Sequence, residues 1–221
     1  MGQMIEFPRP DGRHGTAYLA PAAPGAPGLV LIQEWWGLNA HIRAVADRFA
    51  AAGFETLAPD LYRGRIASSA DEASHLMDGL DFADATHQDL RGAVRHLAAQ
   101  GRKVGVLGFC MGGALSVAAA VHVPELGAAV CFYGIPPAEF ADPARIRIPF
   151  QAHFATRDDW CTPAAAHHLE QAMRQAGQHP SCYHYEAHHA FFNSARPEVY
   201  DAAAAELAWQ RSVDFLKRSL A

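Results

Sequence analysis

Apolar runs of strand length recur along this chain and alternate with segments of helical periodicity. Such runs carry few polar residues, which is typical of strands buried on both faces of a sheet. They cover residues 29–34, 54–59, 104–109, 126–134 and 149–155. Amphipathic stretches lie between them, the clearest over residues 40–53, 83–101 and 163–177. The alternation predicts an α/β fold with a mostly parallel central sheet and helices on both faces.

The length of the chain fits one such sheet. It has 221 residues, of which 50% are hydrophobic, enough for one sizeable core. The Pro- and Gly-rich segment over residues 21–28 is too short to separate two domains. We therefore expect a single domain over residues 1–221, closed by a long helix over residues 197–220.

The charge pattern excludes several classes of partner. Charged residues make up 19% of the chain, the net charge is −5, and no run of Lys and Arg stands out. Nucleic acid and an anionic membrane are therefore not expected partners. No apolar run approaches the roughly 20 residues of a membrane-spanning helix, and residues 1–15 do not resemble a signal peptide. We expect a cytoplasmic protein and, by default, a monomer.

Four cysteines are present, and their spacing argues against a structural role. Cys110, Cys131, Cys161 and Cys182 form no C-x-x-C pair. A chain of this length does not need disulfides for stability, so reduced thiols are expected. The sequence therefore predicts neither a disulfide framework nor a zinc site built from thiolates.

Gly108-Phe109-Cys110-Met111-Gly112 lies between a predicted strand and a predicted helix. Hydrolases of the α/β type place their nucleophile at the centre of such a G-x-x-x-G turn. Glycines on either side avoid a collision with the strained central residue. The helix N-terminus that follows favours a thiolate and a developing oxyanion. Cys110 is therefore the candidate nucleophile, although a cysteine buried by close helix–sheet packing would show the same spacing.

An acid and a histidine are expected downstream of this turn, in that order. Asp158 and Asp159 follow the strand over residues 149–155, and either could orient an imidazole. We favour Asp158 because it comes first after the strand. His189 follows the strand over residues 182–186 and is the candidate base. Its neighbours His184 and His188 admit a metal site as an alternative, but no further ligand falls at a usual spacing.

Glu34 ends an otherwise apolar strand, a poor place for a carboxylate without a function. It is a candidate to bind or deprotonate the thiol, with a carboxylate at the start of the next helix as the alternative. Trp35 and Trp36 follow, and one of them is expected in the core. The main-chain N–H groups of Trp35 and Met111 form a candidate oxyanion hole.

Five motifs, in this order, resemble the dienelactone hydrolases: QEWWGLN, APDLY, GFCMGG, RDDWCTP and AHHAFFN. The resemblance spans nearly the whole chain. It implies an α/β-hydrolase fold and a Cys–His–Asp triad that works without metal or organic cofactor. By this resemblance Cys110 is the nucleophile, His189 the base and Asp158 the acid, and Glu34 is similar to the glutamate that pairs with the thiol. The implied substrate is a small lactone or ester.

Some positions depart from the pattern of the family. Members use arginines to hold the substrate carboxylate, but Asn193 occupies one such position and residues 70–80 contain no arginine. Arg63, Arg65 and Arg196 are nearby in sequence and are candidates to replace them. These departures leave open a related esterase or thioesterase with a different substrate. A non-catalytic binding protein on the same fold is a third interpretation, against which stands the presence of all four site residues at strand ends.

Overall fold

The computed structural model describes residues 2–221 and contains a central eight-stranded sheet. The strand order is β1-β2-β4-β3-β5-β6-β7-β8, in which β2 is antiparallel to both of its neighbours and the strands from β4 to β8 are parallel. The strands are β1 (Gln3–Pro8), β2 (His14–Ala20), β3 (Gly28–Ile32), β4 (Glu55–Pro59), β5 (Val104–Phe109), β6 (Ala128–Phe132), β7 (Phe150–Arg157) and β8 (Ser181–His188). The predicted mostly parallel sheet is confirmed.

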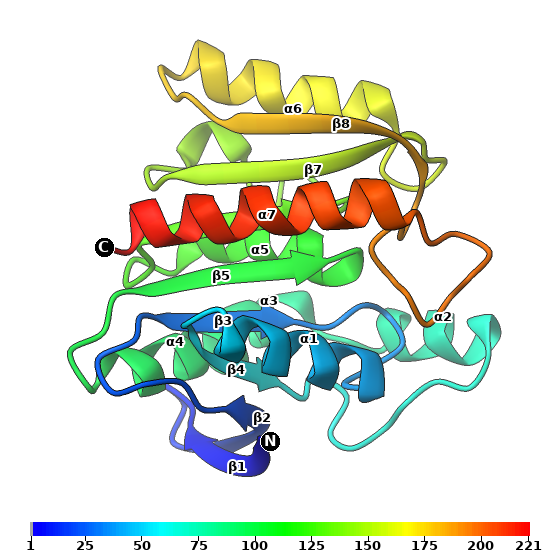
Figure 1. Ribbon diagram of the computed structural model, residues 1–221. Coiled ribbons are helices and arrows are strands. Elements are labelled where there is room, and N and C mark those ends of the chain that lie inside the picture. Colours follow the sequence, from blue (N-terminus) through cyan, green and yellow to red (C-terminus); the bar gives the residue numbers. More distant parts are fainter. Residues whose placement is uncertain (1) are drawn as a thin grey trace.

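Helices cover both faces of the sheet. Helices α1 and α7 lie in front of it in the view of Figure 1, and α4 and α5 lie behind it. The helices are α1 (Ala40–Ala51), α2 (Ala70–Asp78), α3 (Phe82–Asp84), α4 (Arg91–Ala98), α5 (Met111–His122), α6 (Pro163–Gln175) and α7 (Ala202–Ser219). A π-helical segment (Ala85–Leu90) joins α3 to α4, and a 3-10 turn (Pro143–Arg145) precedes β7.

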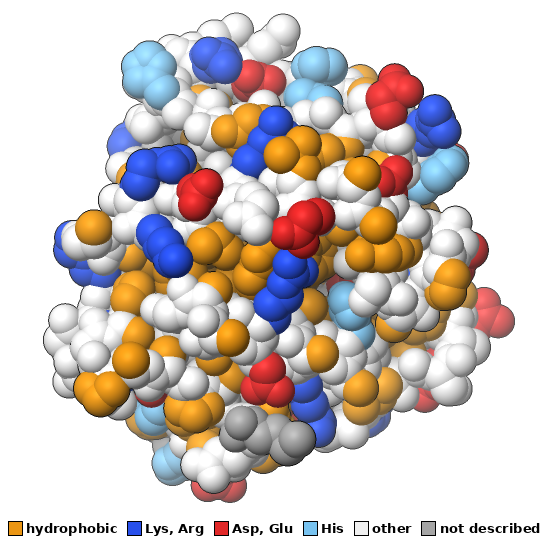
Figure 2. Space-filling view, viewed as in Figure 1, with side chains coloured by type: hydrophobic (Ala, Val, Ile, Leu, Met, Phe, Trp, Pro, Cys, Tyr) orange, Lys and Arg blue, Asp and Glu red, His pale blue; other side chains and the backbone are white. Residues whose placement is uncertain are grey.

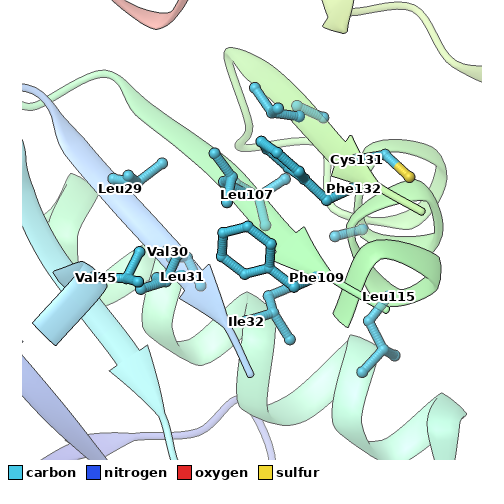
Figure 3. Close-up of a cluster of buried hydrophobic side chains, with 14 of the residues drawn as sticks. Leu29, Val30, Leu31, Ile32, Val45, Leu107, Phe109, Leu115, Cys131 and Phe132 are labelled. Atoms are coloured by element: carbon cyan, nitrogen blue, oxygen red, sulfur yellow. The ribbon is translucent and has the colours of Figure 1, made fainter. Parts of the chain in front are cut away.

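The central strands are buried along their whole length. Every residue of β3, β5 and β6 is buried, as the continuous apolar runs predict. Leu107 and Phe109 of β5 lie beside side chains of β3 and β6 such as Leu29 and Phe132 (Figure 3). Burial of each large apolar side chain contributes about 2 kcal/mol to folding. This core fixes the positions at which the central strands end.

Three element boundaries differ from the sequence prediction. The strand predicted over residues 29–34 ends two residues sooner, since the pairing of β3 with β5 stops at Ile32 opposite Gly108. Glu34 therefore lies beyond the strand. The final helix begins at 202 rather than 197, because the Asp201 side chain accepts the N–H of Ala204 at 2.9 Å and caps it. The predicted helix 83–101 starts within α3 and passes through the π-helical segment before it becomes α4.

Charged side chains of both signs lie on the face of the molecule seen in Figure 2. Basic and acidic side chains are intermingled there. The exposed ion pairs of the molecule include Arg48 with Glu206 at 2.7 Å. Within residues 2–221, no helix combines the length and the apolar character needed to cross a membrane.

The sheet topology marks one place for a site. Strand β3 lies between β4, which follows it in sequence, and β5, so the direction of strand progression reverses between β3 and β5. Open parallel sheets bind ligands at the carboxyl ends of the strands beside such a reversal. Glu34 follows β3 and Cys110 follows β5 at this point.

Candidate active site

Cys110 lies on a strained turn between β5 and α5. Its backbone has φ 56° and ψ −117°, a conformation that side chains other than glycine rarely adopt. A Cβ atom on Gly108 would overlap the carbonyl of Gly112, and one on Gly112 would overlap the carbonyls of Gln33 and Ile32. The Cys110 N–H donates to the carbonyl of Phe132 on β6 at 3.0 Å. Both glycines are therefore required by close main-chain approach.

The Cys110 thiol differs from the other three in its environment. It lies directly before helix α5 and faces two cavities, and it is partly exposed, as Cys182 also is. The free N–H groups and the positive dipole end of that helix stabilise negative charge on the sulfur. Burial raises the pKa of Cys131 and of Cys182 to about 12, which keeps those thiols protonated at neutral pH. Among the cysteines, Cys110 has the environment of a nucleophile.

Asp158 and His189 meet at the carboxyl ends of β7 and β8. The Asp158 Oδ2 atom lies 2.7 Å from the His189 Nδ1 atom. The other carboxylate oxygen, Oδ1, accepts the main-chain N–H groups of Trp160 and Cys161, each at 2.8 Å. These bonds fix the carboxylate, and the carboxylate in turn fixes the imidazole. Asp159 is exposed, so the geometry favours Asp158 of the two adjacent candidates.

The environment of His189 favours its charged form. Burial by itself lowers its pKa, but the Asp158 carboxylate and the neighbouring Cys110 sulfur outweigh burial and raise the pKa of His189 to about 10. An imidazole held in this way can accept a proton from a nucleophile and pass it to a leaving group. His188, the preceding residue, is the last residue of β8 rather than part of the loop and is exposed.

Glu34 is buried beside the site but is bonded to other groups than the thiol. Its Oε2 atom accepts the Asn193 side-chain N–H at 2.6 Å, and its Oε1 atom accepts the Tyr133 hydroxyl at 3.4 Å. Burial raises the pKa of Glu34, and the Asn193 bond offsets this in part. Glu34 and Cys110 line the same cavity, so the two groups are brought together without a direct hydrogen bond between them.

We call the space of about 220 Å³ beside Cys110 the tryptophan cavity. It is lined by Glu34 and His189, the two groups predicted to exchange protons. Its wall includes Arg196, which forms an ion pair with Glu198 at 2.8 Å and lies 5.4 Å from the Trp36 ring. Among the three arginine candidates, Arg196 reaches the site, whereas Arg63 is paired with Asp89 and Arg65 lines neither cavity at Cys110. The lining residues are Glu34, Trp35, Trp36, Met77, Cys110, Trp160, His189, Ala190, Arg196 and Val199.

Both Trp35 and Trp36 are partly buried and face this cavity, so neither is a core residue.

Sequence reasoning missed Tyr133, Met77 and Trp160. Tyr133 directly follows β6, and the rule that sites lie at strand ends would have identified it had that strand been included. Met77 and Trp160 belong to α2 and to the loop after β7, and no local pattern indicates that they meet at Cys110.

In the part of the chain that the structure describes, the ligand atoms of His184, His188 and His189 do not form a group within 4.8 Å of one another. His184 lies against α6, with its ring 4.9 Å from that of His167 and its Nε2 atom 3.9 Å from Glu170. Within residues 2–221, these three side chains are the group of His, Cys, Asp or Glu residues whose ligand atoms approach within 4.8 Å of one another. None of the three lines either cavity at Cys110, and Arg174 already holds the Glu170 carboxylate at 2.7 Å.

The chain is similar to a known family and to several proteins and structures. The Dienelactone hydrolase family matches residues 15–220. "Protein usf" of Aquifex pyrophilus is 35% identical, and a "Putative carboxymethylenebutenolidase" of Aquifex aeolicus is 31% identical, each over the full length of both chains. The crystal structure of a "Putative Dienelactone Hydrolase" from Klebsiella pneumoniae has a TM-score of 0.86 at 25% identity and covers 99% of each chain.

The parallel sheet and the turn at Cys110, together with the likeness to the Klebsiella pneumoniae structure, define an α/β-hydrolase fold. More closely, the chain belongs to the dienelactone hydrolase family. Its activity is hydrolysis of ester or lactone bonds, as the homologues indicate.

Proposed function

We propose that this enzyme hydrolyses small lactones and activated carboxylic esters through a thioester on Cys110. His189 is the base, Asp158 orients it, and the N–H groups of Trp35 and Met111 hold the oxyanion. The observation that carries the proposal is the 2.7 Å contact between Asp158 and His189, with His189 and Cys110 on the wall of the same two cavities. The turn that holds Cys110 at the start of α5 gives the sulfur access to both.

The proposed reaction has two stages. The Cys110 sulfur attacks the carbonyl carbon, an S–C bond forms, and the C–O bond to the leaving group breaks. The leaving enolate or alkoxide takes a proton from the His189 imidazolium, which leaves His189 neutral. Water then attacks the thioester while His189 accepts its proton, and the acid and the Cys110 sulfur are released.

Glu34 has a supporting role in this proposal. Its carboxylate is buried, which raises its pKa and so its affinity for a proton, and it borders the cavity that contains the thiol. A carboxylate in this position accepts the thiol proton when a substrate displaces it from Asn193. We assign Asn193 and Tyr133 as the groups that hold Glu34 away from the sulfur in the resting enzyme.

Replacement of the thiol tests the proposal most directly. Cys110→Ala should lower kcat/KM for a dienelactone and for p-nitrophenyl acetate by about 10³-fold or more. Cys182→Ala, a cysteine variant on β8 outside both cavities, is the matched control and should retain activity. Intact-mass analysis should detect an acyl adduct on the wild type and none on Cys110→Ala. Wild-type turnover by Cys110→Ala would refute the assignment.

A substrate panel separates the related functions. Turnover of a dienelactone together with aryl esters supports the dienelactone assignment. Turnover of aryl esters or acyl thioesters alone would select the related esterase or thioesterase. Absence of any adduct on the wild-type protein would favour the binding protein.

A further inference from the structure

A second cavity of about 220 Å³ reaches Cys110 and is lined almost entirely by apolar side chains. We call it the apolar cavity. It lies between α3, the start of α5 and the loop after β6, and the residues found in this cavity and not in the tryptophan cavity include Phe82, Met111, Ala114, Ile135, Pro136 and Pro137. Nothing in the proposed reaction so far uses this space.

The two cavities differ in charge. The tryptophan cavity contains the carboxyl group of Glu34 and the guanidinium of Arg196. The wall of the apolar cavity has no Asp, Glu, Lys or Arg side chain among the residues that the structure describes. Its polar groups are His189 and the thiols at the site itself, together with the Tyr133 hydroxyl, which donates to Glu34. A hydrocarbon group can enter it without leaving a charge unsolvated.

Trp160 marks the boundary between the two cavities. Its side chain is 70% exposed although it is large and apolar, and it lines both cavities. Its backbone is held by the bond from its N–H to Asp158, and its ring packs edge-on against Trp35 at 5.6 Å. Aromatic rings exposed at the rim of a cavity are typical of sites that bind an apolar ligand.

Acyl transfer to Cys110 requires space on two sides of the sulfur, one for each substituent of the carbonyl carbon. The carbonyl carbon bound at Cys110 carries an acyl substituent and a leaving group, and both must extend away from the sulfur. Cys110 lies where the two cavities meet, so each cavity can take one of these substituents.

We propose that the apolar cavity is a substrate subsite, and that the enzyme prefers esters with a linear hydrocarbon or aryl part of about four to eight carbon atoms. This proposal rests on Cys110 as the nucleophile. Transfer of each methylene from water into such a cavity should raise kcat/KM about fourfold until the cavity is full. From an acetyl to a hexanoyl ester the expected gain is on the order of 10²-fold.

Two ester series test which substituent enters the cavity. One varies the acyl chain of p-nitrophenyl esters from acetate to decanoate, and the other varies the alcohol chain of alkyl acetates. The specificity ratio is kcat/KM for the six-carbon member divided by that for the two-carbon member. We expect this ratio to be on the order of 10² in one of the two series, which identifies the substituent.

Variants of the cavity wall sharpen the test. Ala114→Phe fills the apolar cavity and should lower the specificity ratio at least tenfold. Ile135→Asp places a charge at a partly exposed position of the same wall and should lower it as well, which covers the case in which Ala114→Phe fails to fold. Val199→Phe narrows the tryptophan cavity and should leave the ratio within twofold. Ala203→Phe, on the exposed side of α7, is the matched control.

The outcomes separate this proposal from the proposed function. A flat chain-length dependence in both series, or a dependence that Ala114→Phe and Ile135→Asp leave intact, would overturn the subsite while Cys110→Ala still abolishes turnover. Retained turnover in Cys110→Ala would instead refute Cys110 as the nucleophile. A ratio that falls in both wall variants and not in Val199→Phe supports the subsite.

Discussion

Two histidines of this molecule are both largely buried and both hydrogen-bonded, yet their protonation is opposite. At the active site, the Asp158 carboxylate helps to raise the pKa of His189 to about 10. Behind it, on β7, burial lowers the pKa of His153 to about 3. The comparison shows that the charge of the hydrogen-bond partner, rather than burial, decides which form of an imidazole is stable.

The groups that hydrogen-bond to His153 are all neutral. Arg211 donates to the Tyr185 hydroxyl at 3.1 Å, and this hydroxyl donates to the His153 Nδ1 atom at 2.8 Å. The His153 Nε2–H faces Gln151 Oε1 and Ser212 Oγ, each at 3.0 Å. Because the nearest charged group is the Arg211 guanidinium, protonation of His153 would bury a second positive charge beside it. His153 is therefore a structural, neutral imidazole.

Removal of the Asp158 carboxylate should make the protonation of His189 more like that of His153. Of the changes in this comparison, it should have the largest effect on activity. Asp158→Asn keeps the size of the side chain but removes the charge, and kcat/KM should fall about 10⁴-fold. The pKa of His189, followed by NMR, should fall from about 10 toward its ordinary value. Asp159→Asn, one residue away and exposed, is the control. An Asp158→Asn enzyme with more than a tenth of wild-type activity would contradict the role of the carboxylate.

The neutral state of His153 predicts sensitivity to acid. Its pKa is about 3 in the folded protein against 6.5 in the unfolded chain, so below pH 6.5 the unfolded chain binds more protons. The free energy of unfolding should therefore fall by up to about 1.4 kcal/mol per pH unit from pH 6.5 down to 3 through this residue alone.

His153→Asn should remove that contribution and flatten the pH dependence, measured by urea unfolding between pH 4 and 7. The exposed His168→Asn variant controls for loss of a histidine elsewhere. Equal slopes for the wild type and His153→Asn would show that the acid sensitivity arises at other groups.

The smallest effect is expected when a single hydrogen-bond partner of His153 is removed. In Ser212→Ala the His153 Nε2–H still has Gln151 as acceptor, so the loss in unfolding free energy should be about 0.5–1.5 kcal/mol. Turnover should not change, because Ser212 lies in the core on α7. A loss above about 3 kcal/mol would mean that Gln151 does not replace Ser212.

The sequence alone predicts the sheet and the order of the site residues because both depend on local patterns. Continuous apolar runs identify the buried strands, and the glycines around Cys110 identify the turn. His189 and Asp158 follow from their places after β8 and β7. The roles of these residues in catalysis stay predictions until the variants are measured.

Contacts between distant segments could not be predicted in this way. Glu34 was expected to bind the thiol, but its carboxylate is taken by Asn193 and Tyr133, which follow other strands. The apolar cavity likewise depends on Phe82 and Ile135, which are far apart in sequence. Element ends also depend on such contacts, as the early end of β3 opposite Gly108 shows.

The crowded turn at Cys110 has a consequence for the order of events in folding. Its conformation is held by main-chain atoms of β3 and β6 as well as β5, so it exists only after these three strands have paired. Pairings of this sequence separation form late. In a newly synthesised or partly folded chain, Cys110 therefore lacks this strained turn, which arises only with the finished sheet. The rate at which an electrophile labels Cys110 during refolding would report the completion of the native structure.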